Sequence, residues 1–438
     1  MTETPTTRIA RPSRLECRIL LALFAVTVLV HGLFGFVYAT RLSPQLLGRL
    51  SSARGEAYLQ GFPGWNTDSE LDSTYINRTA LSILRRGLPY SRQGTLVLRT
   101  AVYSYFVAAC YALGGVRLLP LVVAQAVLSG LTGFIFASAA GRLLGGRKFI
   151  RAIVATLYLV NLRVAMYVGY VTPLVLTLLF TALAFWGLAR WKDRRSPLWI
   201  VLGLVLGTYT SSTFFTVALA GASWLLLWRR SFLGFWAITL FVALKFLVTF
   251  SNMAGSGIEL GRAGDRGAIF WLSNNPYYER MRPWDLWEWR PENQWSTWKM
   301  TADERDRHEA YLARSGQNEL RATLLWIREN PGSYAQVCLA RLRTEFGPYT
   351  GEMSPRNRLI STLIWLLVFP AGFYCLWQLR HDPAGQFVAL VVIAVFASGT
   401  FVSEEPYLRY RMPVDLLLTA LAGGSYALWS GRRTAEEP

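Results

Sequence analysis

Long apolar segments alternate with short basic ones along the 438 residues of this chain. Several of the apolar segments approach the ~20 residues that cross the ~30 Å hydrocarbon core of a bilayer as a helix. We therefore predict an all-α polytopic membrane protein with about ten transmembrane helices. The predicted spans are residues 19–38, 117–140, 149–169, 171–189, 197–210, 213–228, 231–250, 359–379, 386–402 and 413–430.

Basic residues in the short loops set the predicted orientation, because such residues stay on the cytoplasmic side. One alternating path keeps all these loops inside, with both termini cytoplasmic and the membrane a cell inner (plasma) membrane. We interpret the first segment as an uncleaved span, although Val37-Tyr38-Ala39 also fits a signal-peptide cleavage site. The basic residues of this path are Arg8, Arg11, Arg14, Arg18, Arg142, Arg147, Lys148, Arg151, Arg190, Lys192, Arg194, Arg195, Arg229, Arg230, Arg380, Arg432 and Arg433.

Residues 97–115 form the one apolar segment that does not fit this path. Counting them as a full crossing would place the basic loop from Arg142 to Arg151 outside. We therefore predict a re-entrant or interfacial helix on the outer side of the membrane.

The same path leaves two long segments outside, residues 39–116 and 251–358. Residues 251–356 contain 14 Lys or Arg and 14 Asp or Glu, which indicates a solvated extramembrane loop domain. A capping box at Thr301 and a stop at Asn330-Pro331-Gly332 predict two helices, one to about residue 313 and one near 318–329. We expect an N-terminal membrane module over 1–250, the loop domain over 251–358, and a C-terminal three-helix module over 359–438.

Composition and charge exclude several classes of function. Hydrophobic residues make up 53% of the chain and charged residues 16%, below the quarter that is usual in soluble domains. The net charge of +18 would suggest a nucleic-acid partner in a soluble chain, but most of the excess flanks apolar segments, where it meets anionic lipids. The four cysteines have no metal-type spacing and no nucleotide-binding motif is present, so we predict no cofactor and no nucleic acid.

Acidic residues gather at the predicted outer face. Asp68, Glu70 and Asp72 lie within five residues of the first outer segment, and Glu404 and Glu405 precede the last span. Neighbouring carboxylates shift one another's pKa, which suits proton abstraction by a general base. Asp72 begins a predicted amphipathic helix that ends at Gly87, so N-capping alone is the alternative explanation for its position.

Basic side chains accompany these acids at the outer ends of the predicted spans. Arg163, Lys245, Arg409 and Arg411 would be in reach of a phosphate group at the lipid boundary. For Lys245, snorkelling to the interface is the alternative. His31 is a lone histidine on the first span, and we predict that it is a packed residue.

Four stretches together carry a resemblance to a known family. In their order and spacing, the chain resembles bacterial GT-C-fold membrane glycosyltransferases, the group that includes the dolichyl- and polyprenyl-phosphate-mannose–protein mannosyltransferases (family 39) and the lipid A aminoarabinose transferases. The stretches are Asp72-Ser-Thr-Tyr-Ile-Asn-Arg-Thr-Ala-Leu-Ser-Ile-Leu-Arg-Arg-Gly87, Ser273-Asn-Asn-Pro276, Leu325-Trp-Ile-Arg-Glu-Asn-Pro-Gly332 and Arg409-Tyr-Arg-Met-Pro-Val-Asp415.

The resemblance implies transfer of a sugar from a polyprenyl-phosphate carrier to an acceptor hydroxyl at the outer (periplasmic) face. The acceptor is a protein, a lipid or a glycan. Asp72 matches the family's catalytic acid in the first outer loop and would deprotonate the acceptor. Lys245, Arg409 and Arg411 would stabilise the phosphate leaving group.

Two departures from the family pattern are visible. The stretch from Tyr167 to Pro173 lacks the second acid of many relatives, which leaves a divalent metal in doubt, and residues 208–213 lack their usual arginine. Two alternatives stay open beside the transferase: a flippase or transporter of a lipid-linked sugar, and a non-catalytic scaffold for envelope assembly.

Overall fold

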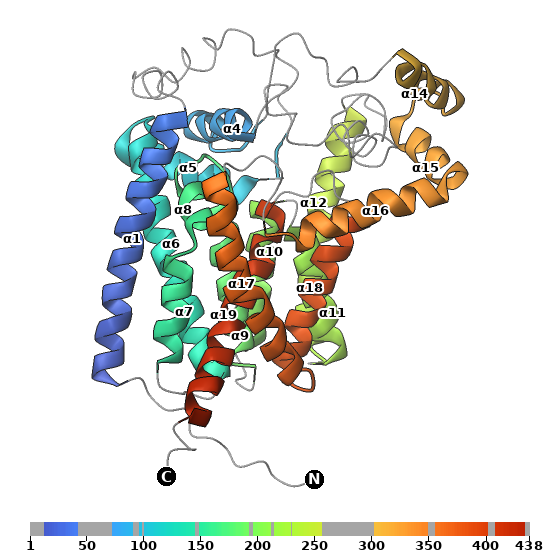
Figure 1. Cartoon of the computed structure of the whole chain (residues 1–438). Helices are drawn as coiled ribbons and strands as arrows, with labels where there is room; N and C mark the ends of the chain where they lie inside the picture. The colour runs from blue at the N-terminus through green and yellow to red at the C-terminus, as the bar shows by residue number, and fades with distance from the viewer. Residues whose placement is uncertain are drawn as a thin grey trace.

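A computed structural model describes residues 13–42, 72–90, 96–98, 100–144, 149–191, 196–211, 214–228, 230–255, 302–348, 355–401 and 408–433. Helices run side by side as a bundle, and further helices cross one end of it (Figure 1). In the described ranges the only β pairing is an isolated antiparallel bridge between Tyr90 and Leu96. The predicted all-α class is therefore confirmed.

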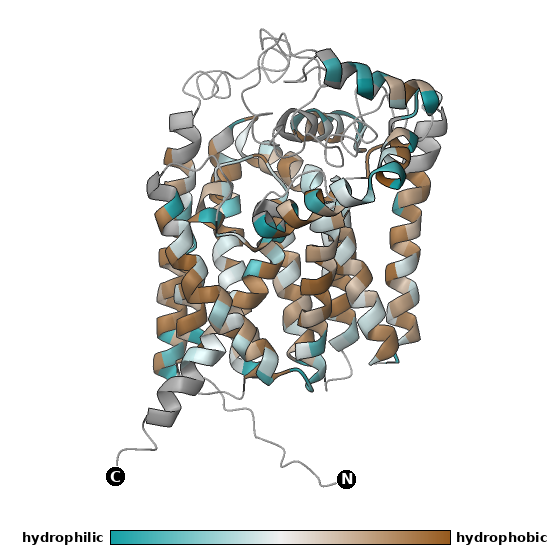
Figure 2. Ribbon diagram, turned by 45° about the vertical axis from the view of Figure 1, so that its right-hand side comes forward, coloured by the Kyte–Doolittle hydropathy of each residue, from teal (hydrophilic) through white to brown (hydrophobic). Residues whose placement is uncertain are grey.

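Helices occupy every predicted span. In the described ranges, four helices are long and apolar enough to cross a membrane, or five when α7 and α8 count as one bent span. Helices α9, α10, α11 and α12 are apolar but shorter over their described apolar segments. Apolar colour dominates the bundle in Figure 2, as expected for a multi-pass membrane protein. The bundle helices are α1 (Arg14–Leu42), α6 (Leu118–Leu143), α7 (Ile150–Leu159), α8 (Leu162–Val168), α9 (Leu174–Leu188), α10 (Ser196–Thr210), α11 (Phe215–Leu227), α12 (Phe232–Gly255), α17 (Pro355–Gln378), α18 (Pro383–Phe401) and α19 (Leu408–Arg433).

The predicted span 149–169 is not one straight helix. Two helices, α7 and α8, lie within this predicted span, and the chain bends by 57° between them. The segment Leu159-Val160-Asn161-Leu162 holds neither proline nor glycine, and its apolar pattern continues across the break. Hydropathy therefore cannot reveal the bend.

Two short helices lie at one end of the bundle, which we call the outer end (Figure 1). In α4 (Asp72–Arg86), Ile76 and Ala80 are buried against α5 (Ala101–Gly114), and Arg85 and Arg86 are exposed, as the amphipathic pattern predicted. Gly87 ends α4 with a φ of +75°. The 14-residue helix α5 lies beside α4 at this end of the bundle, in agreement with an interfacial or re-entrant helix.

The stretch 251–358, which the sequence predicts to be an extramembrane loop domain, contributes three helices that lie wholly within it to the described structure. The two expected helices are present as α14 (Ala302–Arg314) and α15 (Glu319–Glu329), and the Asn318 side chain caps α15 by accepting from the Arg321 amide at 3.0 Å. The sequence analysis missed α16 (Pro331–Phe346), which follows at once. Pro331 ends one helix and begins the next, because a proline at the first helical position has no amide to leave unpaired.

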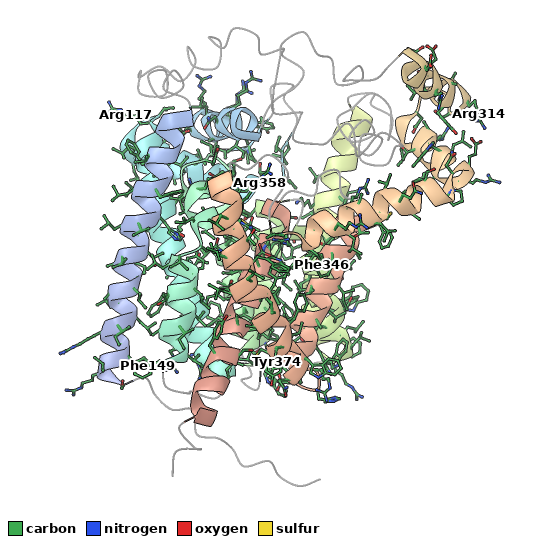
Figure 3. The ribbon with its side chains drawn as sticks, in the orientation of Figure 1. Arg117, Phe149, Arg314, Phe346, Arg358 and Tyr374 are labelled. Carbon is green, nitrogen blue, oxygen red and sulfur yellow. The ribbon has the colours of Figure 1, made fainter. Side chains whose placement is uncertain are left out.

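The opposite end of the bundle, the inner end, holds the beginning of α1 and the end of α19 (Figure 1). Phe149 and Tyr374 lie toward that end, and Arg117 and Arg358 lie toward the outer end (Figure 3). The path of the chain therefore returns to the side where it began, as the predicted topology requires. One core of buried apolar residues is shared by α6, α7, α9, α10, α11, α17, α18 and α19.

Candidate functional site

Two arginines converge on one carboxylate toward the outer end of the bundle. Arg411 and Asp415 are one turn apart on α19, and the Arg411 Nε donates to Asp415 Oδ1 at 2.8 Å. Arg163, on α8, places its Nη1 3.5 Å from Asp415 Oδ2. The Arg411 side chain is 0% exposed, and those of Arg163 and Asp415 are each 10% exposed. Two buried guanidinium groups thus share a single carboxylate.

Backbone carbonyls at and just after the end of α16, together with the Ser361 hydroxyl, accept further hydrogen bonds from these arginines. Arg411 Nη1 donates to the carbonyl oxygens of Glu345 and Gly347, the latter at 2.7 Å. Arg163 donates to the Pro348 carbonyl. These oxygens would otherwise be the unpaired acceptors of a helix end. They carry only partial charge, so among the described residues one positive charge of the arginine pair is not balanced by a direct ion pair.

Glu345 supplies a second carboxylate to this neighbourhood. It is 4% exposed and makes no ion pair within the described residues, and its side chain packs on Gly399, where an added Cβ would meet Oε1 at 2.7 Å. Burial raises the pKa of Glu345 to about 7, with Asp415 adding to the shift and Arg411 opposing it. Near neutral pH this carboxyl group is therefore partly protonated and leaves the cluster with an excess of positive charge.

Contacts along α16 fasten it to the outer end of α18. The buried Arg341 donates to the Thr400 carbonyl at 3.1 Å, and the Tyr334 hydroxyl donates to the Phe401 carbonyl at 3.0 Å. Phe346 stacks on Phe396 with ring centroids 4.2 Å apart, and Figure 3 places Phe346 where α16 reaches the bundle. These contacts hold the end of α16 against the bundle, where its carbonyl groups accept hydrogen bonds from the two arginines.

The structure brings together only some of the residues that the sequence predicted. Arg163 and Arg411 meet, whereas Lys245 lies elsewhere: on α12, it donates to the Thr208 carbonyl of α10 and lies 6.0 Å from the Tyr209 ring. Asp72 is the first residue of α4 and Arg409 lies in α19, but their side chains are outside the described part. Four of the predicted acids fall outside the described residues altogether: Asp68, Glu70, Glu404 and Glu405.

Sequence reasoning missed Glu345 and Arg341. Their spacing of four residues places them on one face of a helix, which is a readable signal. The surrounding stretch is amphipathic and solvated in composition, so nothing local marks that face as buried. No three His, Cys, Asp or Glu side chains gather as a metal site would require in the part of the chain that the structure describes.

These features define a multi-pass helical membrane protein with a buried, cation-rich cluster at one end. No family model matches the sequence, and no curated protein matches it. Among solved structures, the chain is similar to ArnT from Cupriavidus metallidurans bound to undecaprenyl phosphate, with 12% identity and a TM-score of 0.37 over 95% of this chain and 79% of that chain. A likeness at these values of identity and TM-score establishes neither family membership nor activity.

Proposed function

We propose that this protein is an integral-membrane glycosyltransferase that moves a sugar from a polyprenyl-phosphate carrier to an acceptor hydroxyl at the outer face. The observation that carries the proposal is the pair Arg163 and Arg411 on the single carboxylate of Asp415. A membrane-anchored carrier keeps its chain among the lipids and its phosphate at their boundary. Arginines bind phosphate through paired N–H donors, so an excess of guanidinium groups toward the end of an apolar bundle suits such a ligand.

The chemistry follows from the residues that the sequence resemblance assigns. Asp72, with Asp68 and Glu70 nearby in sequence, takes the proton of the acceptor hydroxyl, whose oxygen attacks the anomeric carbon of the sugar. The bond from that carbon to the phosphate oxygen breaks, and the polyprenyl phosphate leaves with the electron pair. Arg163 and Arg411 stabilise the charge of the leaving phosphate.

Several further parts of the proposal come from the sequence alone. Lys245 and Arg409 are additional phosphate-binding candidates, and Glu404 and Glu405 are candidates for binding the sugar or the acceptor. The membrane is an inner (plasma) membrane, with both termini cytoplasmic and the outer end of the bundle facing the periplasm.

Native mass spectrometry of the full chain in detergent tests donor binding, with undecaprenyl phosphate as the probe. We expect the wild type and Asp72→Asn to retain the lipid, and Arg163→Gln to weaken its binding about tenfold, equivalent to the loss of about one charge-assisted hydrogen bond. Arg151→Met, which removes a buried arginine at the inner end, is the matched control and should bind normally. A wild type that retains no lipid, or an Arg163→Gln variant equal to it, would contradict the proposal.

The same measurement separates the transferase from its alternatives. A glycosylated carrier that co-purifies should accumulate in Asp72→Asn, because transfer is blocked while donor binding persists, and its mass identifies the sugar. A scaffold or a flippase has no need of this base. Full biological function in Asp72→Asn would therefore favour one of those alternatives.

A further inference from the structure

The bend between α7 and α8 determines where Arg163 points. Arg163 is the second residue of α8 and follows the 57° break directly. Sharp bends without proline or glycine arise at π-bulges or where a side chain or a water molecule enters the ladder of backbone hydrogen bonds. A side chain that takes the place of a backbone donor is therefore one cause to look for at this break.

His31 of α1 is that group. In an unbroken helix the amide of Arg163 would donate to the carbonyl of Leu159, four residues earlier. Here the His31 Nε2 lies 3.0 Å from the Leu159 oxygen. A carbonyl only accepts, so Nε2 carries the proton and donates. The histidine thus replaces the Arg163 amide as the donor to Leu159, which releases Arg163 from the ladder of α7.

Neighbouring hydroxyl groups hold the His31 ring in place. Its Nδ1 lies 2.8 Å from the Ser129 Oγ, and this Oγ lies 3.0 Å from the Tyr158 hydroxyl. All three side chains are fully or almost fully buried. With Nε2 donating, the neutral ring accepts from Ser129 at Nδ1, so one tautomer and one orientation satisfy every partner.

The far end of α8 is held in a similar way. Gln125 of α6 donates from Nε2 to the carbonyls of Val168 at 2.9 Å and Tyr170 at 3.0 Å. Gly35, one turn after His31, lies against Gly169. A Cβ added to Gly35 would be 2.7 Å from the Gly169 amide nitrogen. Because both ends of α8 are tied to neighbouring helices, the direction of the Arg163 side chain is set by α1 and α6.

We infer that His31 is a positioning residue for Arg163: by taking the Leu159 carbonyl, it bends the span and directs the guanidinium toward Asp415. The role of Arg163 toward a lipid phosphate rests on the proposed function. The bend and its link to the Arg163–Asp415 pair do not depend on any ligand.

Affinity for undecaprenyl phosphate tests the inference in four proteins: the wild type, His31→Leu, Arg163→Gln and the double variant. Removing the donor at residue 31 returns the Leu159 carbonyl to the Arg163 amide and straightens the span. His31→Leu should therefore lose about tenfold in affinity, like Arg163→Gln, and the double variant should be within about twofold of either. His31→Gln, which keeps an N–H donor, should recover most of the affinity.

A buried threonine offers a matched control. Thr181 bonds only the Thr177 carbonyl of its own helix, at 2.8 Å, so Thr181→Val should leave the affinity unchanged. Should His31→Leu fail to fold, Ser129→Ala removes only the hydroxyl that orients the ring and carries the same test. Affinity losses that multiply in the double variant would mean a general structural role and would overturn the inference.

Equilibrium unfolding of the same four proteins gives a readout without lipid. If His31 acts through Arg163, Arg163→Gln should destabilise the His31→Leu protein much less than it destabilises the wild type. A wild type that binds no undecaprenyl phosphate would refute the proposed function but leave this coupling to be measured. Additive destabilisation would refute the positioning role itself.

Discussion

Buried arginines meet carboxylates at both ends of the bundle, in different proportions. At the inner end, Arg151 of α7 donates from Nη1 to both oxygens of Glu16 on α1, each at 3.0 Å. Toward the outer end, Arg163 and Arg411 share Asp415, and they also donate to backbone carbonyls at and just after the end of α16 and to the Ser361 hydroxyl.

The proportion of charges decides what each cluster can do. One arginine with one carboxylate is neutral, so the inner pair ties α1 to α7 and has little attraction for an anion. Two arginines with one ionised carboxylate keep a positive charge, and the partly protonated Glu345 offsets it incompletely. Buried charge that lacks a full partner is costly and is most often kept for function.

Breaking the outer cluster should have the largest effect. Arg411→Met leaves Asp415 with Arg163 alone and removes the donor from the Glu345 and Gly347 carbonyls. Each buried carbonyl left without a donor costs about 1–3 kcal/mol, so we expect Arg411→Met to lower the free energy of unfolding by about 2–5 kcal/mol. Equilibrium unfolding in mixed detergent micelles measures this free energy, and a loss below about 1 kcal/mol would show that water or lipid already satisfies these groups.

Glu345→Gln should change how the stability of the protein depends on pH, and this change is specific to the outer cluster. The folded-state pKa of about 7 lies above the ordinary 4.5, so the folded protein binds more protons, and its stability falls as pH rises from about 4.5 to about 7. The glutamine does not titrate, so the variant should equal the wild type at pH 4 and below and exceed it by up to about 3 kcal/mol at pH 8. Unfolding free energies of both proteins across this window give the difference. If the difference in unfolding free energy between the two proteins did not change with pH, the raised pKa of Glu345 would be contradicted.

The inner pair should respond more weakly and without any effect on ligand. Arg151→Met leaves Glu16, whose side chain is 13% exposed, with some access to water, so we expect a loss of about 1–3 kcal/mol. Affinity for undecaprenyl phosphate should stay at the wild-type value. A parallel loss of affinity would mean that the two ends are not independent.

The smallest effect is expected for the exposed pair of Arg314 and Glu329. Arg314 lowers the pKa of Glu329 through a hydrogen bond and through its charge, but both groups face solvent. Exposed ion pairs contribute little and are screened by salt. Glu329→Gln should leave the melting temperature unchanged at any salt concentration, and a clear shift would place α14 and α15 in a tighter packing than their exposure indicates.

Much of the helical framework could be predicted from local pattern. Apolar runs located the bundle helices to within a few residues. The amphipathic helix predicted between Asp72 and Gly87 is present as α4, and Ile76 and Ala80 lie on its buried face. The helix α16 was missed because Asn330-Pro331-Gly332 ends one helix and starts another. The α7–α8 bend was missed because its donor, His31, is on a different helix.

The sequence by itself determined the class of the protein, since hydropathy is a local property and each segment buries its apolar residues whatever its neighbours are. It also marked Arg163 and Arg411 as cations near the outer boundary. Only the tertiary structure decided that these two meet at Asp415, that Lys245 does not join them, and that Glu345 is buried beside them. Such pairings depend on how helices far apart in the chain pack, and packing joins residues that no local pattern connects.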